Sequence, residues 1–382
     1  MKILVVGHAY LAPINRKKWD VYANIFPEDE VVVVTPSFWN DALFDVALVE
    51  SNTATTRVTY KHVPVSRPGN EVLYRYAWTD VWQIMNECDP DLLLVEQGLS
   101  AFSYFQFILV SLLQGRRIPR VFFTWINWRH RWGWLFRFLW WPLEWFNWYF
   151  SSAAIVGNPQ AEKLLREDGF KAPVLVSPQL GVDLVPVVPR SAEHKNKRVG
   201  FVGRLTSEKG IFTLLHAFAQ LQHEDWELVF VGSGPQQKAL QIEAERCGIS
   251  LQVVFTGSVD HERALELINS FEILVLPSLD IATWREQFGH VIIEAMAAGV
   301  VVIGSDAGAI PWVIGDAGLI FRQNCIEELR DVLSRVLHSD AERLKYAQRG
   351  LHRVTERYTH ESVARAIGKF LHERTRTPGI LS

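Results

Sequence analysis

The sequence has few cysteines, and its charges nearly balance. Its three cysteines, Cys88, Cys247 and Cys325, are far apart, and their spacing matches neither a metal site nor a redox pair. We expect inert thiols in a reducing compartment. The 39 lysines and arginines against 42 acidic residues give a net charge of −3, which provides no overall basic field for nucleic acid. A disulfide scaffold, a cysteine metal centre and a nucleic-acid-binding protein are therefore not expected.

The sequence also lacks a segment that would clearly span a membrane. The nearest candidate is the run of residues 101–113, whereas a spanning helix needs about 20 apolar residues. Residues 1–7 are typical of a short buried strand rather than a secretory leader. We therefore expect a cytoplasmic protein.

What the chain contains is a repeated alternation of short buried strands and helices. Its 382 residues, 48% of them hydrophobic, are enough for two domains, each with its own core. The alternation predicts α/β domains with doubly wound parallel sheets. We expect strands at 1–7, 30–35, 92–96, 121–127, 153–156, 174–177, 198–202, 228–232, 253–257, 273–276 and 300–303. We expect helices at 79–86, 159–168, 211–222, 264–271, 290–298 and 358–374.

The stretch Pro277–Gly308 carries the most chemistry. It predicts a strand, a polar loop with Glu286, a helix with Glu294 and a second strand, so the loop lies where open parallel sheets bind ligands. The free N–H groups near Phe288 and Gly289 could receive an anion. Carboxylates that bind hydroxyl groups beside such a helix end suit a sugar joined to a phosphate. From the residues alone, two solvated surface carboxylates are an equally good interpretation.

These residues resemble a known signature. Glu286, Phe288, Gly289 and Glu294 are similar to the Glu-x7-Glu motif of the retaining glycosyltransferases called family 4, or glycosyl transferases group 1. The similarity continues through Gly299, Val301, Ser305, Asp306, Gly308, Pro311 and Gly315. The resemblance implies that Glu286 binds the donor sugar and supports catalysis, and that Glu294 binds the ribose.

The resemblance implies the GT-B fold, in which two Rossmann-like doubly wound domains face a cleft and a C-terminal helix crosses back to the first domain. The expected acceptor-binding domain is residues 1–187 together with the helix 358–382. The expected nucleotide-sugar-binding domain is residues 188–357, after a linker at 186–197 rich in proline and charge.

A second motif follows the first strand of the second domain. Gly203 allows close approach of a ligand to the backbone, while Arg204 and Lys209 supply cations at a helix start, as a phosphate site requires. Loop arginines and lysines are usually solvated, but this spacing resembles the family's donor-phosphate motif. Gly234 and Val259 match further donor-side positions. The resemblance implies a UDP- or GDP-linked sugar donor, with no metal and no cofactor.

Acceptor contacts are expected from the first domain. His8 follows the first strand and Asn127 follows the strand at 121–127, both at positions that the family uses near the reacting sugar. The Gly-rich turn common after the first strand is absent, and asparagine replaces a histidine that many relatives have. The resemblance implies that Asn127 and His8 assist catalysis, although retaining transfer does not strictly need a protein base.

Residues 125–148 are unusually rich in tryptophan. They hold eight of the fifteen tryptophans, interleaved with Arg129, Arg131 and Arg137. This mixture is typical of a lipid headgroup boundary, so residues 125–150 are a candidate contact for an anionic membrane surface, on the inner face of the membrane. Pro142 interrupts the segment, and no clean amphipathic face is evident. Core helices of the first domain are the alternative.

The sequence therefore predicts a metal-independent, retaining glycosyltransferase. Its acceptor is expected to be lipid-linked or a polysaccharide, as in cell-surface glycan synthesis. A catalytically inactive nucleotide-sugar-binding or scaffold protein of the same fold is the main alternative. A nucleotide-sugar epimerase or phosphorylase on the same architecture fits less well, because the donor motifs are those of a transferase.

Overall fold

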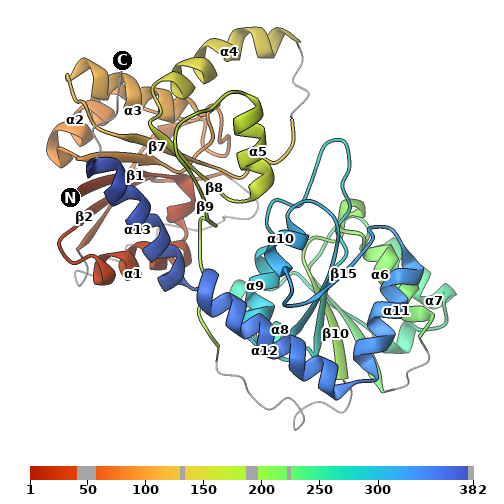
Figure 1. Cartoon of the computed structure of the whole chain (residues 1–382). Helices are drawn as coiled ribbons and strands as arrows, with labels where there is room; N and C mark the ends of the chain where they lie inside the picture. Colours follow the sequence, from red (N-terminus) through yellow and green to blue (C-terminus); the bar gives the residue numbers. More distant parts are fainter. Residues whose placement is uncertain (41–56, 130–133, 186–196, 222–224, 377–382) are drawn as a thin grey trace. The chain divides into compact units, whose positions relative to one another are not determined.

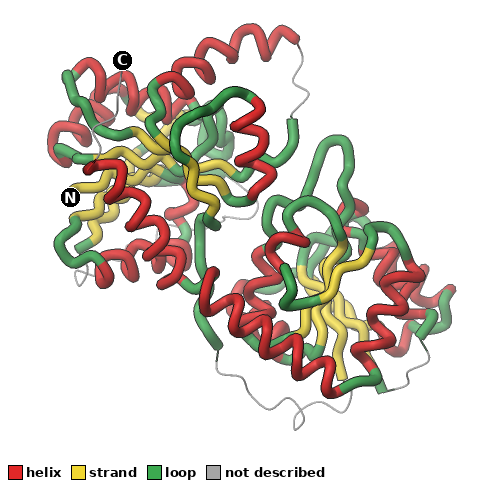
Figure 2. The backbone as a smooth tube through the Cα atoms, in the orientation of Figure 1, coloured by secondary structure: helices red, strands yellow, loops and turns green. Residues whose placement is uncertain are grey.

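The structure is a computed structural model that describes residues 1–40, 57–129, 134–185, 197–221 and 225–376. The chain divides into two compact units, one of residues 1–181 and 360–382 and the other of residues 182–359. In each unit a parallel sheet lies at the centre and helices lie around it (Figure 2). The expected linker, 186–197, lies outside the described residues except for Lys197, which begins a strand of the second unit.

The first unit contains a seven-stranded parallel sheet with the order β3-β2-β1-β6-β7-β8-β9. The central strand β1 pairs with β2 and β6, so that Ile3 lies opposite both Val31 and Leu92. The order reverses between β1 and β6, which makes the carboxyl ends of these two strands the switch point of the sheet. The strands are β1 (Lys2–Val6), β2 (Glu30–Pro36), β3 (Val58–Val63), β6 (Leu92–Val95), β7 (Arg120–Thr124), β8 (Ala153–Val156) and β9 (Val174–Val176).

Two apolar clusters cover the two faces of this sheet. One packs against α2 (Trp78–Cys88), α3 (Phe102–Leu113) and α5 (Pro159–Glu167). The other packs against α1 (Lys17–Ile25) and α13 (His360–Arg376). Figure 1 shows α13, in blue, beside α1, in red, although more than 330 residues of sequence separate them. The last helix of the chain therefore completes the core of the first unit, as predicted.

The smaller elements of the first unit lie around the ends of the sheet. A short antiparallel pair, β4 (Val65–Ser66) and β5 (Arg75–Tyr76), precedes α2. Two turns of 3-10 helix, η1 (His8–Leu11) and η2 (Pro13–Arg16), follow β1. The helix α4 (Trp134–Tyr149) follows β7 and continues through Pro142.

The second unit contains a six-stranded parallel sheet with the order β12-β11-β10-β13-β14-β15. Its strands are β10 (Lys197–Val202), β11 (Trp226–Val231), β12 (Val253–Gly257), β13 (Ile273–Leu276), β14 (Val301–Ser305) and β15 (Leu319–Phe321). Its helices are η3 (Ser207–Lys209), α6 (Ile211–Ala219), α7 (Gln237–Arg246), η4 (Ser250–Gln252), α8 (His261–Asn269), α9 (His290–Ala297), α10 (Ile310–Ile314), α11 (Ile326–Leu337) and α12 (Asp340–Arg357). The order reverses between β10 and β13, so the switch point lies where these two strands end.

The prediction of doubly wound parallel sheets is confirmed, while several boundaries were wrong for local reasons. The helix predicted at 264–271 begins at His261, because Asp260 accepts a hydrogen bond from the Arg263 N–H and caps it. The strand predicted at 121–127 ends at Thr124. Beyond it the Asn158 side chain, rather than a neighbouring strand, donates to the Trp125 carbonyl.

Candidate donor site in the second unit

Two loops meet at the switch point of the second sheet. The loop after β10 carries Arg204 and Lys209, and the loop after β13 carries Ser278 and Glu286. A backbone hydrogen bond of 2.8 Å from the Leu279 N–H to the Glu208 carbonyl joins them. Side chains distant in sequence are thereby brought together where this class of sheet binds ligands.

Lys209 and Glu286 form an ion pair at this point. The ammonium nitrogen lies 2.7 Å from Glu286 Oε2, and the same oxygen accepts a hydrogen bond of 3.0 Å from the Ser278 hydroxyl. Glu286 is 8% exposed, so the carboxylate is largely removed from water. Because a buried carboxylate needs hydrogen-bond partners, Lys209 and Ser278 together hold the Glu286 side chain in place.

Trp284 is a further contact of the Lys209 ammonium. The nitrogen lies 4.6 Å from the centroid of the indole ring, within the range of a cation–π interaction. Arg204 differs from Lys209, because its side chain is 61% exposed and lies 3.9 Å from the Glu208 carboxylate. The site therefore contains one largely buried cation and one exposed cation.

Two glycines allow neighbouring loops to lie very close to the loop that follows β13. Gly210 has φ of +66°, and a Cβ there would lie 1.9 Å from the Pro277 carbonyl oxygen. Gly308 has φ of +49°, and a Cβ there would lie 2.1 Å from the Glu286 carbonyl oxygen. Both values are far inside van der Waals contact, so any side chain would push the backbone of the Glu286 loop away.

The helix α9 begins directly after Gly289, which has φ of +80°. The Phe288 side chain is buried and contacts Trp312 and Tyr358, so it fixes the entry to the helix by packing. Burial raises the pKa of Glu294 above its ordinary value, and the charge of His261 opposes the shift. The side chain is half-buried, so the carboxylate can accept hydrogen bonds from ligand hydroxyl groups.

The remaining donor-side residues predicted from the sequence lie on neighbouring strand ends. Gly203 follows β10 with φ of +152° and Gly234 follows β11, where a Cβ would lie 2.3 Å from the Leu205 carbonyl oxygen. Val259 lies between β12 and α8 and is half-buried. Every predicted donor residue thus lies in a loop that follows a strand of the second sheet, or on α9.

The predicted acceptor residues lie at strand ends of the first unit. His8 is stacked on Trp39 with ring centroids 4.6 Å apart, and its Nε2 lies 3.5 Å from the Glu71 carboxylate. Hydrogen bonding by the His8 ring holds the pKa of Glu71 below its usual range. Asn127 is 2% exposed and lies in the loop after β7, beyond the end of that strand. His8 and Asn127 follow different strands of the same sheet.

A buried charge pair that the sequence did not reveal lies at the switch point of the first sheet. Lys18 Nζ donates to Glu96 Oε1 over 2.6 Å, and both side chains are 1% exposed. Tyr10 and Gln179 donate to the other carboxylate oxygen, Gln179 over 2.9 Å. Burial lowers the pKa of Lys18, and Glu96 opposes that shift. Glu96 is therefore a buried, ion-paired carboxylate rather than a solvated group at the end of a strand.

In the described part of the chain one group of side chains has the composition of a metal site. It consists of His216, Glu243 and Cys247, on α6 and α7 rather than on the loops at the switch point. Glu243 is already engaged by Arg246 and His216, whose hydrogen bonds lower its pKa to about 2. An ion-pair cluster explains these contacts without a metal.

Most of the second unit matches a known protein family. Residues 189–353 match the family Glycosyl transferases group 1. This range covers nearly the whole of the second unit and includes all of the loops described above. The residues predicted to bind the donor therefore lie within the matched group 1 domain.

Two curated relatives are similar over about half of the chain. The MMP alpha-(1->4)-mannosyltransferase of Mycolicibacterium hassiacum is 31% identical over 217 residues, which are 55% of this chain and 51% of the relative. The phosphatidyl-myo-inositol mannosyltransferase of Mycobacterium leprae is 30% identical over 207 residues, 52% of this chain and 53% of the relative. The matched part of the chain covers about half the length of each of these relatives.

A solved structure extends the similarity to the whole chain. The Anabaena protein HepE, in complex with UDP, superimposes with a TM-score of 0.73 at 18% identity, covering 98% of this chain and 100% of that one. At this identity the likeness concerns the fold. The chain has the GT-B fold, with two Rossmann-like domains, and the fold class predicted from the sequence is confirmed.

Proposed function

We propose that the chain is a retaining glycosyltransferase that moves a sugar from a nucleotide diphosphate sugar to an acceptor. The observation that carries the proposal is the Lys209–Glu286 pair at the switch point of the group 1 domain. It places a cation for a diphosphate next to a carboxylate for a sugar, in a position where the sheet leaves backbone groups free for a ligand.

The proposed roles follow from the geometry of the site. Lys209 and the exposed Arg204 neutralise the diphosphate as it leaves. Glu286 accepts hydrogen bonds from the sugar hydroxyls, and its negative charge stabilises the oxocarbenium-like transition state. Glu294 binds the ribose hydroxyls. Two cations meet the charge of the leaving group, so the proposed mechanism uses no divalent metal and no cofactor.

The first unit is proposed to bind the acceptor. His8 and Asn127 follow strands of that sheet, and we assign them to acceptor contact. In the proposed retaining reaction the departing phosphate oxygen takes the proton of the acceptor hydroxyl, so neither residue has to act as a base.

UDP and GDP are the proposed donor nucleotides, and the structure of HepE in complex with UDP supports UDP. A lipid-linked acceptor is proposed, with support from the similarity to the phosphatidyl-myo-inositol mannosyltransferase. A polysaccharide of the cell surface is the other proposed acceptor. We propose that the enzyme works in the cytoplasm, where nucleotide sugars are made.

The proposal predicts nucleotide release from a single class of donor. The purified chain would be incubated with UDP-, GDP- and ADP-linked sugars, with and without a chelator, and released nucleotide would be measured. We expect release from a UDP- or GDP-sugar, unchanged by the chelator, because the leaving group is held by Lys209 and Arg204. Absence of both release and nucleotide binding would favour an inactive scaffold protein instead.

Gly308→Ala should impair transfer without changing any functional side chain. The new methyl group must displace the Glu286 carbonyl, which now lies 2.1 Å from its position. A displacement of about 1 Å at a reacting group costs about a hundredfold in rate, so we expect a fall of kcat of that order. Steady-state kinetics would measure it. Gly169→Ala, in the first unit, is the matched control, because it also has positive φ but no neighbour within 4 Å of the added Cβ.

A further inference from the structure

One side of α4 is a row of exposed aromatic side chains. Phe138, Trp141, Trp145 and Tyr149 are 74%, 58%, 46% and 53% exposed. Their spacing of three and four residues places them on one face of the helix. The sequence did not predict a clean face, because Pro142 was expected to interrupt the segment. The helix instead continues through this residue, which is itself exposed.

The opposite side of α4 is fixed to the first unit. The Trp140 indole donates to the Ser100 carbonyl over 2.8 Å, and the Asn147 amide donates to the Leu99 carbonyl over 2.7 Å. Phe146 packs against Phe105 of α3, with ring centroids 4.9 Å apart. These contacts fix the orientation of α4. The exposed aromatic row therefore lies on the side of the helix that faces away from the rest of the first unit.

The aromatic surface continues from α4 onto its neighbours. On α2, Trp78 and Trp82 are 45% and 43% exposed, and Trp78 contacts the Phe102 and Phe105 rings of α3. At the far end of α3, Leu113 is 65% exposed. Figure 1 shows α2, α3 and α4 on the same side of the sheet of the first unit. We call the exposed residues of these three helices the aromatic face.

Charge is nearly absent from the aromatic face. The described part of α4 that bears the row, residues 138–149, contains one charged residue, Glu144, whose carboxylate accepts a hydrogen bond from Ser100. The helix α3 contains none. On α2, Glu87 is paired with Lys61, and Asp80 lies in the first turn of the helix. Exposed helix faces usually carry many charges, so an extended aromatic face with few of them indicates a surface that is covered in function.

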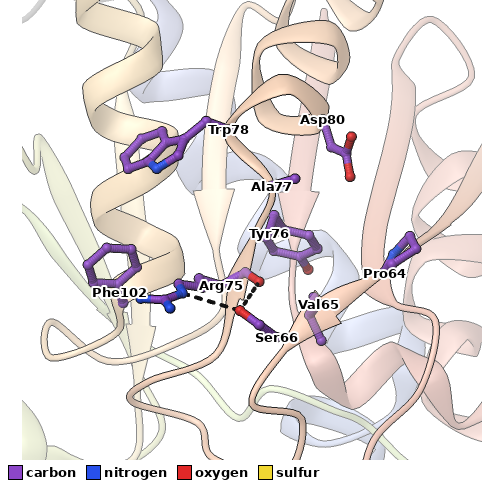
Figure 3. Close-up of a pocket in the computed structure, with 9 residues that line it drawn as sticks. All are labelled: Pro64, Val65, Ser66, Arg75, Tyr76, Ala77, Trp78, Asp80 and Phe102. Atoms are coloured by element: carbon purple, nitrogen blue, oxygen red, sulfur yellow. Dashed lines mark hydrogen bonds between the residues drawn. The ribbon is translucent and has the colours of Figure 1, made fainter.

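Cations lie at the edge of this face. A pocket of about 580 Å³ opens where α2 and α3 begin, lined by Trp78, Phe102, Ser66, Arg75 and Asp80 among others (Figure 3). The Arg75 guanidinium lies between the Phe102 ring, 6.0 Å from its centroid, and the Ser66 hydroxyl, 3.2 Å away. Arg117, just after α3, is also exposed.

We propose that the aromatic face of α2, α3 and α4 docks on the surface of a bilayer that contains anionic phospholipids, with Arg75 contacting headgroup phosphates. Tryptophan and tyrosine rings are favoured at the bilayer interface because one end is apolar and the other polar. The cations at the edge of the face are complementary in charge to anionic headgroups. A face that packed into a protein core would have no need of such cations. No helix in the described part of the chain has the length and apolarity needed to cross a membrane, so the contact is peripheral.

This inference narrows the expectation for residues 125–150 and adds α2 and α3 to it. Arg129, in the predicted segment, is engaged with Asp168 and Glu167 and is therefore not part of the face. The membrane surface is a partner of the proposed transferase, and it would bring the enzyme to a lipid-linked acceptor. The contact itself depends only on the first unit.

The test is sedimentation of the full chain with vesicles of phosphatidylcholine, alone or mixed with phosphatidylglycerol. The wild type should bind the anionic vesicles. The triple variant Trp141→Ser, Trp145→Ser, Tyr149→Ser should bind about tenfold more weakly, because apolar burial drives interfacial binding. Arg75→Gln should weaken binding to the anionic vesicles only. The double variant Trp78→Ser, Trp82→Ser, on α2, should also weaken binding. This second variant separates loss of the aromatic face from a local folding defect in α4.

The matched control is Ile242→Ser, Leu251→Ser, Leu344→Ser, which removes three exposed apolar side chains from the second unit and should bind like the wild type. The proposal is overturned if the wild type does not bind anionic vesicles, or if the α4 variant binds as well as the wild type. A wild type that dimerises in sedimentation velocity, does not bind vesicles and becomes monomeric in the α4 variant would assign the face to a second copy. Nucleotide release without vesicles should be the same in wild type and variants, so failure of docking and failure of the transferase proposal give different results.

Discussion

Glu286→Gln should abolish most of the sugar transfer without weakening nucleotide binding. The glutamine keeps the size of the side chain and can still accept a hydrogen bond from the Ser278 hydroxyl, which now lies 3.0 Å from the carboxylate. It loses the negative charge that faces the developing positive charge of the sugar. Removal of one fixed electrostatic contact of this kind lowers kcat by about 10²- to 10³-fold.

The measurement is kcat with the donor identified in the nucleotide-release panel, together with the dissociation constant of the free nucleotide. Nucleotide affinity should not fall below that of the wild type, because the diphosphate is held by Lys209 and Arg204 and no longer competes with a carboxylate for Lys209. Glu243→Gln is a suitable control, since this carboxylate of the same unit is also ion-paired but lies on α7. A variant that retains transfer within about tenfold of the wild type would contradict the assigned role.

The ion pair also predicts a difference between the empty and the occupied site. Lys209 is held at 2.7 Å by Glu286 and at 4.6 Å by the Trp284 ring. A diphosphate would compete with the carboxylate for this ammonium, and its arrival would release Glu286 to bind the sugar. Binding of the phosphate part and binding of the sugar part are in this way coupled through one lysine.

The donor-site motifs were predictable because their information is local. Glu286 and Glu294 are eight residues apart around a strand end and a helix start, and Gly203, Arg204 and Lys209 lie in one loop. Their spacing resembles the motifs of a known family, whereas the residue types alone were equally compatible with solvated surface carboxylates. The contacts of Ser278 and Trp284 with this pair were not predictable, because they depend on the path of the loop after β13.

The buried ion pair of the first unit could not be predicted, because its two residues are far apart in the sequence. Lys18 and Glu96 are 78 residues apart, and neither has a neighbour that marks it as buried. A lysine at the start of a helix and a glutamate at the end of a strand are usually solvated. Only the parallel pairing of β1 with β6 brings η1, α1 and the end of β6 together.

Lys18→Met should destabilise the first unit strongly. The substitution removes the ammonium and leaves the Glu96 carboxylate, 1% exposed, with hydrogen bonds from Tyr10 and Gln179 but no positive charge. Breaking a buried ion pair in this way costs about 3–5 kcal/mol of the free energy of unfolding. For a unit of this size each kcal/mol lowers Tm by about 2–4 °C, so we expect a fall of about 10 °C.

Thermal unfolding followed by tryptophan fluorescence suits this measurement, because only Trp226, Trp284 and Trp312 of the fifteen tryptophans lie in the second unit. The double variant Lys18→Met with Glu96→Gln should regain much of the lost stability, since the glutamine oxygen can accept from Tyr10 and Gln179 without a buried charge. If the single variant unfolds like the wild type, the pair is not an essential part of the fold. If the double variant is no more stable than the single one, the loss comes from altered packing around residue 18 rather than from the unpaired carboxylate.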